Sequence, residues 1–188
     1  MIASTLLGPV LAQAGDDPVS PMDERVREAR AVSAELAAKL KYQLEAAMKA
    51  DGPVAALAIC NTVAPEIAND LSRSFGGEIG RTALKVRNPN NKPDAFERGI
   101  LERFIAEAAA ATDMANLEYS ELVEENGKRV FRYMKAIPMA EKPCAACHGK
   151  SISPAVLDNI KKIYPEDQAT GFTSGEVRGA FTISKPVD

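Results

Sequence analysis

Two of the three cysteines and the only histidine of the chain stand together in Cys144-Ala145-Ala146-Cys147-His148. This CxxCH spacing is typical of covalent c-type haem attachment. Two thiols three positions apart can each form a thioether with one of the two vinyl groups at a haem edge, and the adjacent imidazole can reach the iron. The motif therefore predicts one covalently bound haem c, with Cys144 and Cys147 as its thioether residues and His148 as an axial iron ligand.

Two other interpretations of the motif stay open. A structural zinc site could draw on Cys144, Cys147, His148 and Cys60, although a histidine directly beside a ligating cysteine fits a tetrahedron poorly. A disulfide or a redox-active CxxC would suit an exported protein, but redox CxxC motifs usually open a helix within a βαβ pattern, which this sequence lacks. Haem attachment is favoured over both.

The second axial ligand has to come from upstream of the motif. Residues 149–188 contain no Met, His or Cys, and a second histidine does not exist. The candidates that carry sulfur are Cys60, Met22, Met48, Met114, Met134 and Met139. Cys60 is either that ligand or a small buried hydrophobe on its helix face, and spacing does not decide between the two. A Cys60 thiolate would stabilise ferric iron and give a low reduction potential.

Other candidate site residues lie on the expected strands. Arg81, Lys85 and Arg87 share one face of an alternating segment, so they are either cations for the haem propionates or a solvated strand face. Tyr133 and Met134 are candidates for packing on the haem, with a place in the core as the ordinary alternative for both.

Composition bounds the class of protein. The chain has 188 residues, of which 46% are hydrophobic and 26% charged, and a formal net charge of -3. These values suit one globular domain and offer no basic field for nucleic acid or an anionic membrane. The chain also lacks a motif that pairs a nucleophile with a base, so we expect no enzyme.

The N-terminus predicts export. Residues 1–14 are apolar and end in Ala12-Gln13-Ala14, which fits the cleavage site of a signal peptide or its remnant, and residues 15–22 read as a linker. An apolar, unstructured end is the alternative. No later stretch approaches the roughly 20 apolar residues of a membrane span, so we expect a soluble periplasmic or otherwise exported protein.

The first half of the domain is predicted to be mostly helical. Apolar residues recur every three or four positions in a long helix over residues 23–50, which Gly52-Pro53 ends. A second helix opens at Pro53, is kinked or broken at Pro65, and ends at Gly76-Gly77. The period then changes to two, which predicts a strand over residues 78–87.

The second half alternates between the two kinds of element. The expected elements are a helix over residues 96–112, strands over 117–123 and 129–137, a helix over 154–163 and a strand over 177–184. Asn126-Gly127 joins the first two of these strands and tolerates the positive φ angles of a tight hairpin. The prediction is an α+β fold with a long N-terminal helix, as a single domain over residues 23–188.

The order of several short motifs resembles a known family, the bacterial c-type haem proteins with a PAS-like domain that were long catalogued as a domain of unknown function. The motifs are Ile59-Cys60, Ala64-Pro65, residues 79–82, residues 85–89, residues 132–135, residues 144–149, Tyr164-Pro165, Gly171 and residues 178–180. The resemblance spans roughly residues 35 to 183. It implies a PAS-like antiparallel sheet with haem against it, and His148 and Cys60 as the two axial ligands.

The resemblance also implies redox or gas sensing. We therefore expect a haem-based sensor module or a low-potential redox protein that works through a redox or signalling partner, with a small gas as a candidate ligand. A simple periplasmic electron-transfer cytochrome is the alternative, and a structural zinc protein is a second one. The long N-terminal helix is a candidate surface for a homodimer.

Overall fold

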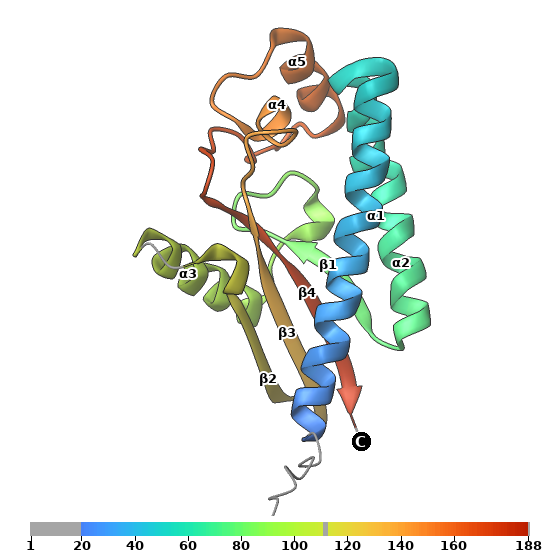
Figure 1. Ribbon diagram of the computed structural model, residues 1–188, viewed down its shortest axis with the longest axis vertical. Helices are drawn as coiled ribbons and strands as arrows, with labels where there is room; N and C mark the ends of the chain where they lie inside the picture. The colour runs from blue at the N-terminus through green and yellow to red at the C-terminus, as the bar shows by residue number, and fades with distance from the viewer. Residues whose placement is uncertain (1–19, 111–112, 188) are drawn as a thin grey trace, which may run out of the picture.

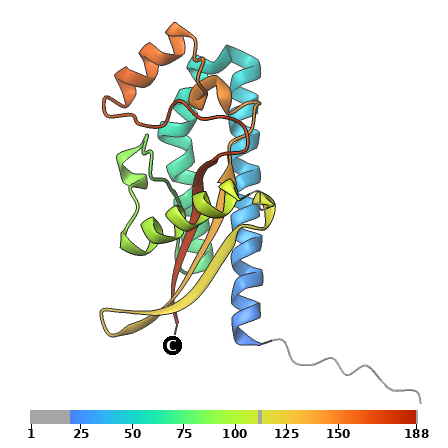
Figure 2. The ribbon, with the colours of Figure 1, turned by 90° about the vertical axis from the view of Figure 1, so that its left-hand side faces the viewer.

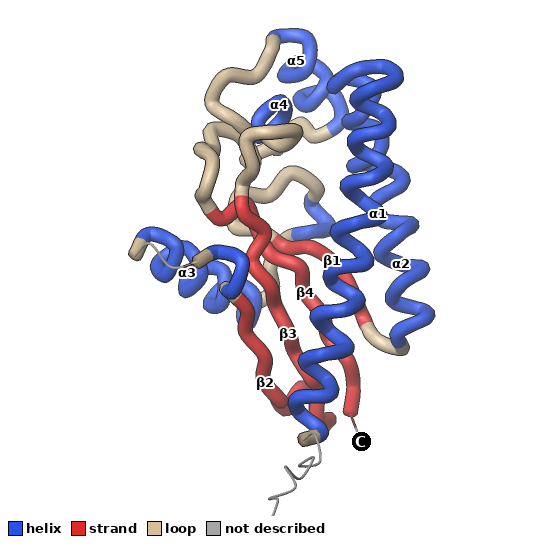
Figure 3. The backbone as a smooth tube through the Cα atoms, in the orientation of Figure 1, coloured by secondary structure: helices blue, strands red, loops and turns tan. Residues whose placement is uncertain are grey.

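A computed structural model describes residues 20–110 and 113–187 of the chain. A four-stranded antiparallel sheet forms its centre, with the order β1-β4-β3-β2 (Figures 1 and 3). The strands are β1 (Glu78–Thr82), β2 (Glu118–Glu125), β3 (Lys128–Pro138) and β4 (Val177–Val187). Helices cover both faces of the sheet, so the predicted α+β fold with a long N-terminal helix is confirmed.

The hairpin between β2 and β3 forms where the sequence predicts it. Asn126 and Gly127 have φ angles of 53° and 74°. Positive φ at both central residues is what a two-residue turn needs to follow the right-handed twist of its strands. β3 then lies between β2 and β4 and is buried along most of its length.

The first helix, α1 (Pro21–Ala58), is longer than predicted. It begins after Ser20, whose hydroxyl accepts a hydrogen bond from the backbone N–H of Asp23, so the expected linker over residues 15–22 ends before Pro21. Gly52 interrupts it with φ 78° and ψ −176°, and the helix resumes at Pro53. The predicted break is therefore a kink within one long element. The expected signal peptide over residues 1–14 lies outside the described residues.

A second irregularity separates α1 from α2 (Ala64–Phe75). Residues Ile59–Val63 form a π-helical turn, in which the N–H of Ala64 donates to the carbonyl of Ile59 five positions back. Pro65 follows directly, and it has no N–H to continue an α-helical ladder. The predicted disruption at Pro65 thus takes the form of a wide turn. This turn carries Cys60.

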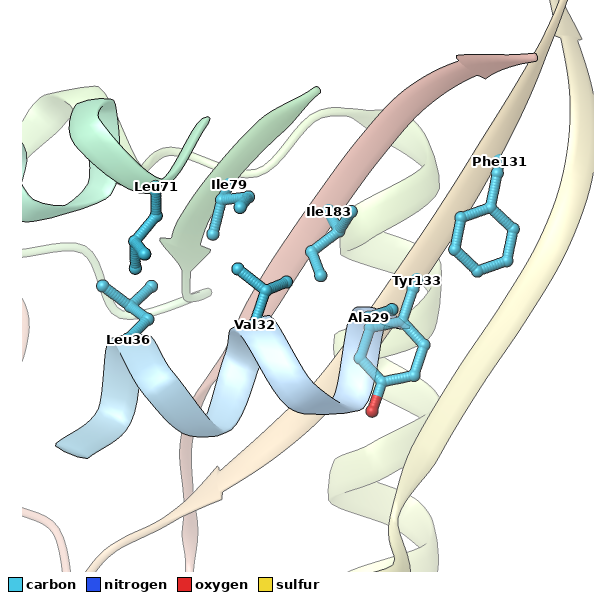
Figure 4. Close-up of a cluster of buried hydrophobic side chains, with 8 residues drawn as sticks. All are labelled: Ala29, Val32, Leu36, Leu71, Ile79, Phe131, Tyr133 and Ile183. Atoms are coloured by element: carbon cyan, nitrogen blue, oxygen red, sulfur yellow. The ribbon is translucent and has the colours of Figure 1, made fainter. Parts of the chain in front are cut away.

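Helices α1 and α2 pack together on one face of the sheet. Their apolar side chains pack on the residues of three strands that point toward these helices, and Figure 4 shows the buried residues of this core. They are Ala29, Val32 and Leu36 from α1, Leu71 from α2, Ile79 from β1, Phe131 and Tyr133 from β3, and Ile183 from β4. This core aligns α1 along the sheet and carries its C-terminal end past the end of the strands (Figure 1).

Helix α3 (Ala95–Ala109) covers the opposite face (Figure 2). Asp94 and Glu97 form a reciprocal capping box at its start, with hydrogen bonds of 2.7 and 3.1 Å between each side chain and the other residue's backbone N–H. Leu101 and Phe104 pack against Met134, Ala136 and Ala180. Alternate residues of β3 thus serve two separate cores.

The strand predicted over residues 78–87 ends five residues early, at Thr82. β1 pairs with β4 only as far as Thr82 opposite Ala180, and the chain then bends away from the sheet. Arg87 is buried among partners in a later segment, so the alternation after Thr82 reflects alternate burial in a loop rather than sheet pairing.

The attachment motif lies at the end of the sheet where α1 extends beyond the strands. There the chain forms the short helix α4 (Ala145–His148) and helix α5 (Pro154–Ile163), which matches its predicted bounds (Figures 1 and 2). Two 3-10 turns, Pro89–Asn91 and Met114–Asn116, flank α3 in the sequence. Among the described residues, no helix is both long and apolar enough to cross a membrane.

Candidate functional site

The CxxCH segment is a single tight helical turn. The backbone N–H groups of Cys147 and His148 both donate to the carbonyl of Cys144, at 3.1 and 2.9 Å, and Gly149 donates to Ala145 at 3.0 Å. A Cβ on Gly149 would lie 2.6 Å from the Ala145 oxygen, so a larger residue would open the turn. The three cysteines of the chain are free and half-buried.

A second segment clamps this turn from the side. Phe172 donates its N–H to the carbonyl of His148, and Gly171 donates to that of Gly149, both at 3.0 Å. Gly149 and Phe172 form a parallel β-bridge. These two hydrogen bonds fix the backbone at His148 and Gly149.

The two cysteines of the motif pack into different small cores. Cys147 contacts the cluster of Leu57, Val156 and Ile160, which joins α1 to α5. Cys144 contacts the cluster of Met139, Ala169 and Phe172. The motif is therefore anchored to α1 and to the segment before β4.

The imidazole of His148 is arranged for ligation through Nε2. Its Nδ1 lies 2.7 Å from the carbonyl oxygen of Ala169. A carbonyl can only accept, so this contact places the proton on Nδ1 and leaves the Nε2 lone pair available to a metal. Burial, followed by the charges of Arg178 and Arg87, holds the pKa of His148 well below its usual value, which favours the neutral ring that a metal requires.

Arg178 makes a competing contact at the same nitrogen, with its Nε 3.1 Å from Nδ1 of His148. Nδ1 cannot donate to Ala169 and accept from Arg178 at once. We take the shorter contact to Ala169 as the hydrogen bond, because Arg178 also has the carbonyl of Lys85 as an acceptor for Nη1, at 3.3 Å. The ring of Phe172 adds an edge-on contact to His148, with centroids 6.4 Å apart.

Cys60 lies near the motif even though 84 positions separate it from Cys144. Burial raises the pKa of Cys147 and of Tyr164, and a negative charge on Cys60 would raise both further. It would also attract the guanidinium of Arg81. The π-helical turn therefore brings Cys60 within electrostatic range of Cys147 in the CxxCH segment.

Arg87 and Asp167 form a buried ion pair beneath the motif. Their side chains are 7% and 6% exposed, and Nε of Arg87 lies 2.8 Å from the Asp167 carboxylate. Nη2 of the same guanidinium donates to the carbonyls of Cys147 and Ala169, at 2.7 and 3.1 Å. Arg87 is thus committed to the backbone that carries Cys147 and to the carbonyl that orients His148.

The expectation that Arg81, Lys85 and Arg87 share one strand face is wrong, because β1 ends at Thr82. Lys85 lies in the bend, where its Nζ donates to the carbonyl of Thr170 at 3.2 Å and sits 4.8 Å from the Phe172 ring centroid. Arg87 is occupied by Asp167 and two carbonyls. Of the three, Arg81 is the one whose guanidinium has no hydrogen-bonding partner among the described residues.

Positive charge in this region exceeds negative charge. The guanidiniums of Arg81, Arg87 and Arg178 act on one another, and only Arg87 has a carboxylate partner within ion-pair distance in the described part of the chain. Burial, then Arg87 and Arg81, lowers the pKa of Arg178 to about 10, so it stays charged at neutral pH. Two half-buried cations without a carboxylate partner among the described residues favour a nearby anionic group.

Tyr133 and Met134 occupy the two main cores. Tyr133 is fully buried against α1 and donates its hydroxyl to Glu118 at 2.7 Å, and Met134 is fully buried against α3. Met114 joins the Met134 core and Met22 the Tyr133 core. Met139 is the methionine that packs with Cys144, which makes it the competitor of Cys60 for the second axial position.

The donor set does not favour zinc. In the part of the chain that the structure describes, no three or more His, Cys, Asp or Glu side chains gather in a cluster suited to a metal ion. One histidine preset for ligation, two thiols on one helical turn and uncompensated arginines instead fit a planar anionic cofactor that is attached at one edge.

Sequence reasoning missed four residues of this site. Asp167, Ala169 and Phe172 lie in a loop without periodicity, and Arg178 is the second residue of β4. The one available signal was the Arg178-Gly179-Ala180 motif, which carried the resemblance but no role. Their contacts to Arg87 and His148 join residues 21 to 82 positions apart, which local patterns do not reveal.

The fold and the site define the chain as an α+β protein whose CxxCH turn is held against the end of an antiparallel sheet. A family model described as Tll0287-like (Tll0287) matches residues 18–186, so the chain belongs to the Tll0287-like family. The predicted family, bacterial haem proteins long catalogued as a domain of unknown function, is confirmed.

A solved structure shares the fold. It is titled the crystal structure of the cyanobacterial heme-protein Tll0287, and it superposes with a TM-score of 0.66 at 22% sequence identity, over 90% of this chain and 98% of that one. At this identity the likeness establishes the architecture. No curated protein matches the sequence.

The Arg87–Asp167 pair yields a stability prediction. Asp167→Asn leaves the buried guanidinium without a counter-charge, so we expect it to lower the free energy of unfolding by roughly 3–5 kcal/mol. Urea denaturation followed by circular dichroism measures this. Asp158→Asn, at an exposed position of α5, is the matched control and should change stability by less than about 0.5 kcal/mol. Equal effects of the two substitutions would show that the pair does not hold the site together.

Proposed function

We propose that this protein carries one haem c, attached covalently through Cys144 and Cys147 and ligated by His148. The observation that carries the proposal is the 2.7 Å contact between Nδ1 of His148 and the Ala169 carbonyl, which leaves Nε2 available within a CxxCH turn. The name of the structural relative, a heme-protein, supports it. When bound, the haem would supply one-electron exchange and a binding position for small gases.

Cys60 is the proposed second axial ligand. A negative charge on Cys60 would interact with Cys147 and Arg81, and Cys60 lies in a π-helical turn, a rare element that occurs often at functional sites. The nearby cation of Arg81 would balance the charge of the thiolate. A thiolate favours the ferric state, so we infer a low reduction potential.

Arg81 and Arg178 are the proposed propionate partners. Both are cations without a carboxylate partner in the described residues, and a negative charge on Cys60 would attract both. Lys85 is exposed and close enough to Arg178 to assist, since the Lys85 carbonyl accepts from Arg178. Arg87 would act indirectly, by holding the carbonyls of Cys147 and Ala169 in place.

The role that these residues support best is that of an exported, PAS-like redox or gas-responsive sensor module, or a low-potential redox protein. It would act without enzymatic chemistry and through a redox or signalling partner, with α1 as a candidate homodimer surface. A closed electron carrier is the competing function. The two differ in whether the bond to Cys60 persists on reduction.

Covalent attachment is tested first. Protein made together with a haem-attachment machinery should show one haem per chain in a pyridine haemochrome assay, and the haem should stay with the chain in acidified acetone because thioethers hold it. Replacing both Cys144 and Cys147 with Ser should release it, whereas Cys60→Ser should not. A colourless protein with one zinc ion per chain would contradict the proposal.

The second ligand is tested by two matched substitutions. Cys60→Ser should change the ferric absorption and EPR spectra, because a thiolate ligand is lost, and Met139→Leu should leave both spectra unchanged. Cys60→Met should raise the reduction potential by on the order of 0.1 V, a fraction of the range that axial ligands span. The opposite pattern, with Met139→Leu altering the spectra, would assign the position to Met139.

Carbon monoxide separates sensor from carrier. A thiolate bond to ferrous iron is weak because its charge favours the ferric state, so we expect the reduced protein to bind carbon monoxide within seconds, seen as a shift of the main haem absorption band. Cys60→Met supplies the control, since a thioether suits ferrous iron and should slow binding at least tenfold. Refusal of carbon monoxide by the reduced wild-type protein would favour a closed carrier.

A further inference from the structure

Tyr164 is a buried phenol at the C-terminal end of α5, and it takes no part in the ligand set or the ion pair of the site. Its side chain is 5% exposed, and its hydroxyl has no hydrogen-bonding partner in the described part of the chain. A tyrosine hydroxyl in a buried side chain usually finds a partner, because it gives up its hydrogen bonds to water. The hydroxyl of Tyr164 is therefore a donor that still lacks an acceptor.

The packing of α5 against α1 places this phenol next to Cys60. Ile160 and Tyr164 are four positions apart and both buried, so they share one face of α5. Ile160 belongs to the same buried cluster as Leu57 of α1. Cys60 follows Leu57 by three positions, one turn further along the helical chain. The next residues along the two contacting faces are therefore Tyr164 and Cys60.

Cys60 is also the acceptor that the surroundings of the phenol leave available. The titratable groups within electrostatic range of Tyr164 are Cys60, Arg87, Arg81 and Asp167, and a negative charge on Cys60 would have the largest effect of the four. A guanidinium can only donate. The Asp167 carboxylate already accepts two hydrogen bonds from Arg87 and one from the N–H of Ala169.

The backbone of Tyr164 is held on both sides. Its N–H donates to the carbonyl of Ile160 at 2.7 Å, and its carbonyl accepts from the N–H of Asp167 at 3.1 Å. Asp167 is fixed in turn by its buried ion pair with Arg87. A donor that is held in this way loses little conformational freedom when it forms a hydrogen bond.

We propose that Tyr164 is a positioning residue that donates an O–H···S hydrogen bond to the Cys60 thiolate when this thiolate ligates the haem iron. The inference rests on the proposed function, because it needs Cys60 as the second axial ligand. Hydrogen bonds to a ligating sulfur are one means by which a protein sets a reduction potential. The bond is stronger in the ferrous state, where the sulfur keeps more of its negative charge, so Tyr164 raises the potential above that of a bare thiolate ligand.

The reduction potential of the full haem-loaded chain tests this bond. Tyr164→Phe removes the O–H and keeps the ring, so it should shift the ratio of ferric to ferrous protein roughly tenfold toward ferric, a fall of about 59 mV for a one-electron couple. Tyr42→Phe, at an exposed position of α1, is the matched control and should leave the potential unchanged. Spectroelectrochemical titration measures both variants, and an unchanged melting temperature shows that each is folded.

A second background shows whether the phenol acts through the sulfur of Cys60. A thioether is a weak acceptor, so in Cys60→Met protein the added Tyr164→Phe should move the potential by less than about a third of its effect in the wild type. The ferric EPR signals of the single Tyr164→Phe variant should also move, because the field of the thiolate on the iron changes. A loss of ring packing alone would act equally in both backgrounds.

Two outcomes would overturn the proposal. One is an unchanged potential in Tyr164→Phe, and the other is an equal shift in the wild-type and Cys60→Met backgrounds, which would place the phenol at the haem edge instead. Both leave the proposed ligand set intact. Unaltered ferric spectra in Cys60→Ser would instead remove Cys60 from the iron, so failure of the ligand assignment is recognised separately.

Discussion

The buried ion pair between Arg87 and Asp167 joins three segments that are distant in the sequence. Arg87 leaves the bend after β1, meets Asp167 in the loop after α5, and donates to the backbone of the CxxCH turn at Cys147. The same guanidinium also holds the carbonyl of Ala169, which fixes the tautomer of His148. A buried cation tolerates few arrangements of its acceptors, so this one side chain constrains the position of the His148 imidazole.

The electrostatics around that pair support the proposed binding of an anionic cofactor. Burial lowers the pKa of both Arg81 and Arg178, since desolvation disfavours their charged forms. Both nevertheless remain charged, and their repulsion costs free energy in the protein alone. An anionic group bound between Cys60 and His148 would offset that cost, so cofactor binding and folding of this end of the molecule would be coupled.

The sheet divides the molecule into regions with different tasks. The face under α1 and α2 is an apolar core that supports Cys60 through the continuation of α1 into the π-helical turn. The face under α3 is apolar near Leu101 and Phe104 but polar around Arg132, which pairs with Asp94 and Glu125. Arg81 pairs with Phe181 of β4 and shares a face with Ile79, so its side chain lies on the α1 and α2 side of the sheet.

The sequence by itself determined the features that local chemistry controls. The CxxCH turn, the Asn126-Gly127 hairpin, the bounds of α5 and the disruption at Pro65 each follow from the properties of a few adjacent residues. The α+β class followed from the spacing of apolar residues, which is three or four positions in a helix and two in a strand with one buried face. The family followed from the order of short motifs.

Only the tertiary structure decided which charged residues face the site and which do not. Arg87 and Asp167 are 80 positions apart, and Arg178 and His148 are 30 apart, so no local pattern pairs them. Alternation after Thr82 resembles a strand, but pairing with β4 ends there and the segment turns to bury Arg87. A sequence pattern can predict that a charged residue is buried, but it does not give the residue's partner or the direction of its side chain. Those are set by contacts between segments that meet only in the folded chain.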